Sequence, residues 1–294
     1  MGVTVLSNVA DTIAKFYSFS IEPSLYKFRR TKRLQELGLD LNRAMFTINV
    51  ALGNCKSPSC LRLQQRYAEY FRHFVHSDGN ASLLKKSGRI AAVIDLQAIK
   101  NYQEFIDLLK KRSGNFYRIA KKAHKAGYET QQFSSKNYAP DILEIHQSLK
   151  IRSFGIVLDA FLLSIDDFGG VPLELNPIEV PECNQHWQLF FGVFIPEEGH
   201  RQGAIVVNKK LVAYAHLERI GNIARYASYM GHGNHMRNGV MMLLHVNIIE
   251  WLQDLNNPLA QGVQFLIYGG IEQGSNGLFF WKRKALFEAR LLCS

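Results

Sequence analysis

The sequence predicts an α/β (α+β) protein with a mixed, largely antiparallel central sheet flanked by helices, preceded by a helical N-terminal segment. Between residues 187 and 230, short apolar runs alternate with tight turns, which is typical of antiparallel hairpins. From residue 239 onward, helical stretches alternate with short apolar strands. The chain of 294 residues is 47% hydrophobic, a composition that can bury a core of this kind.

Residues 1–87 are predicted to form a helical N-terminal segment of unassigned role. Its clearest element is an amphipathic helix over 60–76, with apolar side chains at three- and four-residue spacing, ended by the turn at 77–80. The apolar stretch at 46–52 is typical of a buried strand or helix segment.

Residues 88–184 are predicted to form the first half of the fold. The expected elements are a strand at 90–94, helices at 101–112 and 116–126, a strand at 128–133, and a helix at 141–150 that begins at Pro140. The stretch 169–184, rich in Pro and Gly, is the best linker candidate.

Residues 185–294 are predicted to form the second half. Strands are expected at 187–195, 203–207, 211–220 and 223–230, followed by a helix at 239–255, a strand at 263–268, a helix at 276–287 and a strand at 288–292.

The charge and cysteine content narrow the class of protein. Lys and Arg number 35 against 25 Asp and Glu, giving a net charge of +10, so the surface attracts polyanions such as phosphates or RNA. The basic residues cluster at 27–33, 110–125 and 282–284. No signal peptide or membrane-spanning run is visible, and four scattered cysteines favour a reducing compartment, so we expect a cytoplasmic protein.

One cysteine and histidine spacing resembles a zinc pattern. Cys55, Cys60, His73 and His76 read C-x4-C-x12-H-x2-H, one residue short of the usual histidine spacing. The residues before Cys55 do not look like a finger hairpin. The sequence therefore favours free thiols beside surface histidines and no metal site, with zinc as the alternative.

Three stretches together resemble the GNAT superfamily, closest to the Fem-type aminoacyltransferases of peptidoglycan bridges and their small acetyltransferase-like relatives. These are LLKKRSGNFYRIAKKAHKAG at 108–127, the Leu-rich helix and strand FLIYGG within 239–270, and GLFFWKRKALF at 277–287. The similar region runs from about residue 88 to the C-terminus. The resemblance implies an acceptor-side half over 88–184 and an acyl-donor-binding half over 185–294. The resemblance implies a GNAT-like fold and transfer of an acyl or aminoacyl group to an amine.

The sequence departs from acetyl-CoA-binding members of the superfamily at the phosphate-binding loop. These carry Q/R-x-x-G-x-G/A, whose backbone N–H groups hold a pyrophosphate at a helix N-terminus. Here the loop reads GHGNHMRNG over 231–239, with Met236 and Met241 at positions expected to be Gln or Arg and a small residue. Trp281 also replaces the usual Phe of the third stretch.

Four residues are the predicted catalytic set. The resemblance places Lys282 where Fem-type enzymes have a lysine facing the reacting carbonyl, so its ammonium would stabilise the oxyanion; the alternative is a solvated lysine. Tyr268 ends a strand at a Gly-Gly turn and can orient the acceptor amine, or be a core tyrosine. His216 and Glu218 alternate on one strand face and can relay a proton, or lie on a solvated face.

Two further sets are predicted to bind the donor. The donor- or phosphate-binding set is His232, Gly233, His235, Arg237, Asn238, Gly239 and Arg283. If the donor is a charged tRNA, the basic helix offers an RNA-binding set of Lys110, Lys111, Arg112, Arg118, Lys121, Lys122 and Lys125. His245, on the apolar helix, is expected to be a satisfied core histidine or one facing another subunit.

The resulting hypothesis is an acyltransferase that forms an amide bond by direct attack of an amine on an activated donor. The donor is an aminoacyl-tRNA or an acyl-CoA or other acyl thioester, the acceptor is a small-molecule or peptide amine, and no cofactor is required. The alternative is a non-catalytic RNA- or phosphate-binding protein that retains the fold. The oligomeric state cannot be inferred from the sequence.

Overall fold

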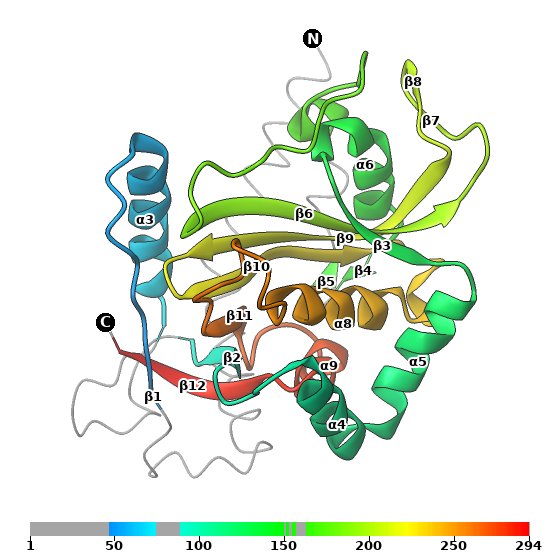
Figure 1. Cartoon of the computed structure of the whole chain (residues 1–294). Helices are drawn as coiled ribbons and strands as arrows, with labels where there is room; N and C mark the ends of the chain where they lie inside the picture. The colour runs from blue at the N-terminus through cyan, green and yellow to red at the C-terminus, as the bar shows by residue number, and fades with distance from the viewer. Residues whose placement is uncertain (1–46, 75–88, 150, 153–154, 157–162, 294) are drawn as a thin grey trace.

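A single eight-stranded sheet forms the centre of the molecule (Figure 1). The computed structural model describes residues 47–74, 89–149, 151–152, 155–156 and 163–293. The strand order is β1-β12-β2-β11-β10-β9-β6-β3. The strands are β1 (Thr47–Asn49), β2 (Ala91–Asp95), β3 (Glu129–Phe133), β6 (His186–Pro196), β9 (Lys209–Ile220), β10 (Ile223–Gly231), β11 (Phe265–Gly270) and β12 (Glu288–Cys293).

Neighbouring strands in this sheet are antiparallel except for two pairs, β1 with β12 and β10 with β11. The fold is therefore a mixed α/β arrangement with a largely antiparallel central sheet, which confirms the predicted fold class. Two small hairpins stand apart from it: β4 (Ile151–Arg152) with β5 (Gly155–Ile156), and β7 (Arg201–Gln202) with β8 (Ile205–Val206).

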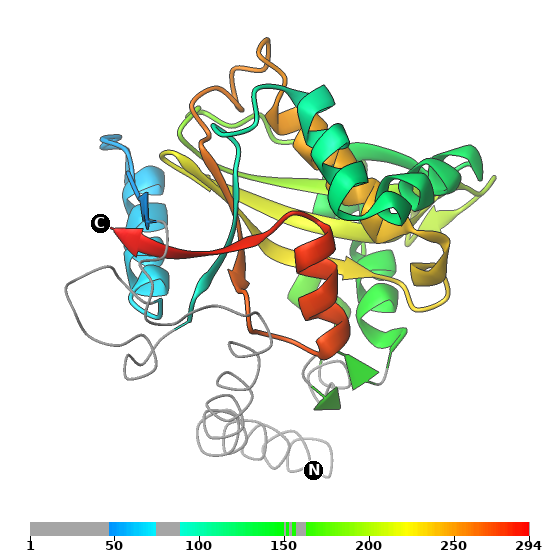
Figure 2. The same ribbon diagram turned by 90° about the horizontal axis from the view of Figure 1, so that it is seen from below.

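Helices cover both faces of the sheet. The helices are α3 (Pro58–Phe71), α4 (Tyr102–Arg112), α5 (Gly114–Lys125), α6 (Ala139–Gln147), α8 (Val240–Leu252) and α9 (Asn276–Lys284), with short 3-10 turns η2 (Ser135–Tyr138), η3 (Ile165–Phe168) and η4 (Met236–Asn238). Apolar side chains of α4, α5 and α8 form one core with the sheet, and those of α3 and α6 form two smaller cores on the other face. Figure 2 shows α4, α5 and α8 on one side of the sheet and α6 on the other. None of the helices in the described ranges has the length and hydrophobicity needed to cross a bilayer.

The described part of the N-terminal segment belongs to this same core. Strand β1 extends the sheet beside β12, and α3 buries Leu63 and Tyr67 against it. The turn between β9 and β10 holds the segment in place, because Asn222 N–H donates to Ala51 O at 3.1 Å and Ala51 N–H donates to Asn222 Oδ1 at 2.9 Å. Only glycine fits at Gly221, where a Cβ would stand 1.7 Å from Ala51 O. Strands from the ranges 1–87, 88–184 and 185–294 therefore share one sheet.

The element boundaries differ from the predicted ones in identifiable ways. The helix expected at 60–76 begins at Pro58 after its N-cap Ser57 and ends at Phe71, because Phe74 bridges to Arg89. The single strand expected at 203–207 is wrong: Gly203, with φ +61°, makes a turn between β7 and β8. Residues 27–33, 77–80 and His76 lie outside the described residues.

Candidate active site

The candidate site lies where β10 and β11 separate. Strand β10 pairs with β9 from Ile223 to Gly231, but pairs with β11 only from Ile223 to Arg225. Each strand then has a register irregularity, after Tyr226 in β10 and after Ile267 in β11. Ligands of α/β sheets bind beyond the carboxyl ends of parallel strands where the sheet order changes, and bulges often re-aim side chains there. The diverging ends of β10 and β11 are such a place.

Aromatic side chains line this point of divergence. The Tyr226 and Tyr229 rings lie 4.7 Å apart between centroids, and Tyr229 lies 5.6 Å from Tyr268 and 5.2 Å from Trp281. The Trp281 indole N–H is buried with no hydrogen-bond partner among the described residues. A buried polar group without a partner is uncommon in folded proteins, and at this position the N–H is suited to a ligand acceptor.

Lys282 is buried at this site and held in one position. Its side chain is 2% exposed, and Nζ donates to the Gly270 carbonyl oxygen at 2.6 Å and stands 4.8 Å from the centroid of the Tyr268 ring. The end of α9 is fixed as well, because Phe287 N–H donates to the Lys282 carbonyl and Leu286 takes a left-handed φ of 71°. The reading of Lys282 as a solvated lysine is therefore wrong; its neighbours Arg283 and Lys284 are the exposed ones.

Tyr268 presents a neutral phenol next to this ammonium. Burial raises its pKa above the ordinary value, so the hydroxyl keeps its proton at neutral pH. No described group forms a hydrogen bond with that hydroxyl. The group can therefore donate to or accept from a bound substrate, but it is not a phenolate base.

His245 connects β10 to the segment that follows Lys282. Burial lowers its pKa to about 4, so the ring is neutral at pH 7. Its Nδ1 accepts from the Tyr226 hydroxyl at 2.9 Å, and its Nε2–H donates to the Ala285 carbonyl at 3.1 Å. This confirms the prediction of a satisfied core histidine.

His216 and Glu218 lie on the opposite face of the sheet from Lys282. Glu218 is buried beneath α3, where it accepts from the Tyr67 hydroxyl and pairs with Arg66 at 2.5 Å and Arg225 at 2.9 Å. Burial alone would raise its pKa, but the hydrogen bond from Tyr67 and the charge of Arg225 bring the pKa below its ordinary value.

His216 stacks on Phe190 with ring centroids 4.4 Å apart, and its Nε2 lies 3.7 Å from Glu218 Oε1. Burial lowers its pKa. The structure thus brings His216 and Glu218 together, as their alternation on one strand predicts, and places them away from Lys282 and Tyr268.

The loop at 231–239 uses most of its own hydrogen-bond donors internally. Gly233 N–H donates to Ser148 Oγ, and Asn234 N–H donates to His232 Nδ1. The N–H groups of 235, 236, 238 and 239 donate to carbonyls within the loop. His232 Nε2 lies 3.2 Å from Glu144 Oε1, and a Cβ on Gly231 would stand 2.6 Å from the Met241 sulfur. The loop is therefore filled by its own residues and does not present a row of N–H groups to a pyrophosphate.

The structure does bring the end of this loop beside the basic helix α5. The His235 ring and the Asn238 amide both bond the Tyr128 hydroxyl, at 2.9 and 2.8 Å. A Cβ on Gly239, which has φ +84°, would stand 2.4 Å from Ile119 of α5. Arg237 is exposed in η4. The N-terminus of α8, with its unpaired N–H groups and partial positive charge, thus lies next to a cationic helix.

The predicted RNA-binding set forms an exposed surface on α4 and α5. Lys110 pairs with Asp107 at 3.1 Å, and Arg112 pairs with Glu288 at 2.9 Å. The other members have no carboxylate partner in the described ranges: Lys111, Arg118, Lys121, Lys122 and Lys125. Arg283 is exposed on α9, with its guanidinium 6.0 Å from the Phe279 ring.

A surface cavity of about 480 Å³ opens elsewhere, at the edge formed by β2, α4 and β12. Charged side chains of both signs line it, namely Asp95, Lys111, Arg112, Glu288 and Arg290. Lys282 and Tyr268 are not among its lining residues.

Sequence reasoning missed the paired rings of Tyr226 and Tyr229, for a physical reason. Side chains three apart on a regular strand point to opposite faces, but the irregularity after Tyr226 inserts one residue and returns Tyr229 to the same face. Simple alternation therefore hides the pair. The structure brings Cys55 and Cys60 together with Cys183 and His186, and not with the His73 of the C-x4-C-x12-H-x2-H spacing.

Comparison with known proteins finds similar solved structures but no matching family. No family model matches the chain, and no curated protein matches it. Similar solved structures include the C-terminal domain of a putative lysylphosphatidylglycerol synthetase from Agrobacterium fabrum (12% identity, TM-score 0.38, 69% of this chain and 57% of that chain) and FemX (10%, 0.44, 76% and 65%). A tandem GNAT protein of clavulanic acid biosynthesis is another (10%, 0.37, 84% and 59%).

The chain thus spans 57% to 65% of the length of these structures. The structural neighbours are GNAT-type proteins, as the sequence motifs led us to expect. Their identities and TM-scores are too low to assign an activity.

Proposed function

We propose that the chain is an acyltransferase in which a substrate amine attacks an activated acyl or aminoacyl carbon directly. The observation that carries the proposal is the buried Lys282 ammonium, anchored on Gly270 O at the point where β10 and β11 separate. Attack on the carbonyl develops negative charge on its oxygen. A cation held in place in a site with little water stabilises that charge without reorganising during the reaction.

Tyr268 has the second role in this proposal. Its ring adjoins the Lys282 ammonium, and its hydroxyl is protonated. The phenol oxygen can accept a hydrogen bond from the attacking amine and orient its lone pair towards the carbonyl carbon. His216 and Glu218 lie on the other face of the sheet. They can take part in proton transfer only if a substrate binds on that face, away from Lys282.

We favour an aminoacyl-tRNA as the donor, with acyl-CoA or another acyl thioester as the second candidate. The support is electrostatic: exposed cations that have no carboxylate partner among the described residues cover α5, and α5 adjoins the N-terminus of α8. Phosphate contacts of this kind provide most of the sequence-independent affinity for RNA. The loop at 231–239, filled by its own residues, is a poor cradle for the pyrophosphate of CoA.

Salt dependence separates the two donors. Binding of a charged or uncharged tRNA should weaken steeply with added salt, and a triple Lys121→Ser, Lys122→Ser, Lys125→Ser variant should lower the slope of log K against log salt by about 2–3. A matched triple variant at Lys136, Lys209 and Lys210, which already pair with carboxylates, should change it less. A large thermal shift with CoA thioesters and none with tRNA would move the assignment to acyl-CoA.

The alternative is a non-catalytic protein that binds RNA or phosphate. The exposed α5 cations fit that alternative equally well. Product formation decides between the two: incubation with aminoacyl-tRNA or acyl-CoA and a panel of amines, followed by mass spectrometry, should reveal a new amide. Tight RNA binding with no covalent product from any donor would favour the alternative.

A further inference from the structure

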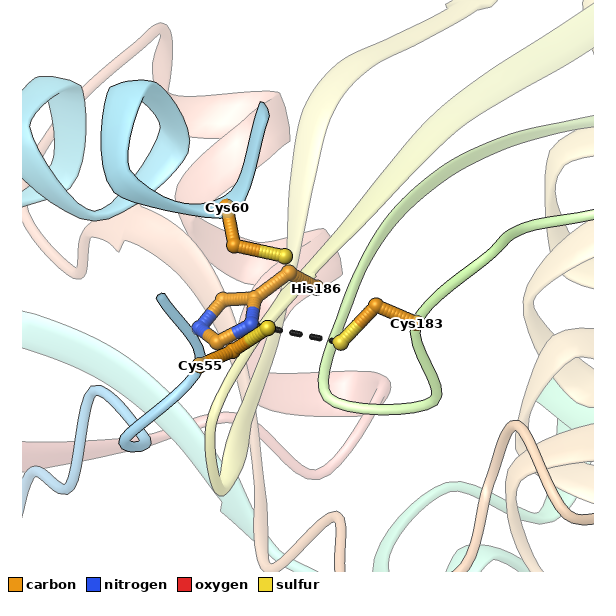
Figure 3. Close-up of side chains that lie close together, drawn as sticks. All are labelled: Cys55, Cys60, Cys183 and His186. Carbon is orange, nitrogen blue, oxygen red and sulfur yellow. Dashed lines mark hydrogen bonds between the residues drawn. The ribbon is translucent and has the colours of Figure 1, made fainter. Parts of the chain in front are cut away.

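Three cysteine thiols and one imidazole converge on a point remote from Lys282. They are Cys55, Cys60, Cys183 and His186, and their ligand atoms all lie within 4.8 Å of one another (Figure 3). Cys55 lies in the loop before α3, Cys60 in the first turn of α3, Cys183 in the linker before β6, and His186 at the start of β6. Segments separated by more than a hundred residues thus bring one donor atom set together.

The dimensions of the cluster are close to those of a tetrahedral zinc site. Zinc binds thiolate sulfur at about 2.3 Å and imidazole nitrogen at about 2.0–2.1 Å, so neighbouring ligand atoms of a tetrahedron stand roughly 3.5–3.8 Å apart. Cys183 Sγ and His186 Nδ1 are 3.5 Å apart, the contact drawn as a dashed line in Figure 3. No separation exceeds 4.8 Å, so each pair needs to close by no more than about 1 Å.

The imidazole of His186 is oriented as a metal ligand requires. Its Nε2 lies 2.7 Å from the Leu52 carbonyl oxygen, which can only accept, so Nε2 carries the proton. The lone pair then stays on Nδ1, which faces the Cys183 sulfur. A second-shell backbone carbonyl that fixes the tautomer is typical of metal-binding histidines. The Gln64 amide nitrogen donates to the Cys55 carbonyl at 3.1 Å; it also lies 3.2 Å from His186 Nε2, a contact that is not a hydrogen bond while Nε2 carries the proton.

The N-terminus of α3 adds partial positive charge beside the cluster. Cys60 N–H donates to the N-cap Ser57 Oγ at 3.3 Å, which places Cys60 at the positive end of α3.

Glycine at position 53 allows the Cys55 loop to pass close to β6. Gly53 has φ +81°, and a Cβ there would stand 2.7 Å from Gln185 Oε1 and 3.1 Å from the His186 ring. A larger residue would push the Cys55 loop away from the start of β6.

We propose that Cys55, Cys60, Cys183 and His186 bind one Zn²⁺ in a tetrahedral structural site. Four protein ligands close the coordination sphere, so the ion would fasten residues 50–60 to the start of β6 and would not activate a substrate. The set replaces the one suggested by the C-x4-C-x12-H-x2-H spacing: α3 separates Cys60 from His73 by thirteen residues, or about 20 Å. His76 lies outside the described residues.

Metal analysis of the full chain, purified under reducing conditions without chelators, tests the proposal. We expect one zinc per chain by inductively coupled plasma mass spectrometry, and loss of most of it in Cys183→Ser and in His186→Gln. Cys293→Ser and His73→Gln are the matched controls and should keep their zinc, because Cys293 lies at the end of β12 and His73 beyond α3.

Cobalt provides a readout of geometry that does not depend on zinc retention. Wild-type protein refilled with Co²⁺ should show the intense visible bands and thiolate charge transfer of a tetrahedral site, and Cys183→Ser should lose them. Cys183 lies in a linker, so this variant should fold even if Cys60→Ser does not. Wild-type protein that holds no zinc and takes up neither metal, or zinc lost equally from Cys293→Ser, would overturn the proposal. A disulfide between two of the three cysteines in metal-free protein would overturn it as well.

Discussion

Replacing Glu218 with glutamine removes one buried negative charge and keeps the side chain's size. In the wild type this carboxylate accepts from Tyr67 and pairs with Arg66 and Arg225. Removing one partner of a buried ion pair costs about 3–5 kcal/mol. We expect the low end, about 3 kcal/mol, because Arg66 is half exposed and Arg225 stands 4.2 Å from the centroid of the Tyr70 ring.

Differential scanning calorimetry at pH 7 measures this cost. A loss of about 3 kcal/mol lowers the Tm of a domain of this size by roughly 6–12 °C. Glu144→Gln is the matched control, since Glu144 pairs with Lys210 at a half-exposed position and its loss should cost no more than about 1 kcal/mol. Transfer activity per folded Glu218→Gln molecule should be retained. An unchanged Tm together with lost activity would refute the structural role and restore Glu218 as a proton relay.

The same network has a defined pH dependence. Because the folded pKa of Glu218 lies below its ordinary value of 4.5, its stabilisation is fully present above that value and is lost as the pH falls through the folded pKa. The stability difference between wild type and Glu218→Gln should therefore be constant near neutral pH and should shrink below about pH 4.5. Urea unfolding of both proteins across this range measures it.

Two further substitutions test the packing that positions Lys282 and the α8 N-terminus. Tyr226→Phe leaves His245 Nδ1 buried without its hydrogen bond and should lower the free energy of unfolding by about 1–3 kcal/mol in urea titrations; no change would mean that the bond is not formed. Gly239→Ala and Gly127→Ala both place a side chain at a left-handed φ, but only at Gly239 does the new Cβ meet another element, Ile119. Gly239→Ala should therefore cost about 1–3 kcal/mol more than Gly127→Ala, and equal costs would contradict the close α5–α8 contact.

Much of the fold could be predicted from local patterns. The apolar alternation of β9, the Gly-Asn turn that follows it and the amphipathic periodicity of α4 all act within a few residues, so each is visible in the sequence. The turn between β7 and β8 could not be predicted, because Gly203 lies inside an apolar run that is typical of a strand. The turn depends on close packing against Val171, which is more than thirty residues away in the sequence. Tertiary contacts of this kind override local propensity.

The site could be predicted only where its chemistry is local. A resemblance singled out Lys282, but the Lys-Arg-Lys run gives no indication that one member is buried and its neighbours exposed. Nothing in the spacing of Cys55 and Cys60 points to Cys183 and His186, because the pairing arises from the docking of α3 beside β6. The strand periodicity of His216 and Glu218 predicted their shared face but not which face it is.

The central claim is that the Lys282 ammonium stabilises the oxyanion of acyl transfer, and single-turnover kinetics of Lys282→Met tests it most directly. Methionine keeps the length and apolar stem of the side chain, and Lys284→Met, at an exposed position on the same helix, is the matched control. With donor and amine saturating, we predict a rate about 10²–10³-fold below wild type, with donor affinity unchanged and the control unaffected. A Lys282→Met rate equal to wild type in a folded, donor-binding protein would contradict the account.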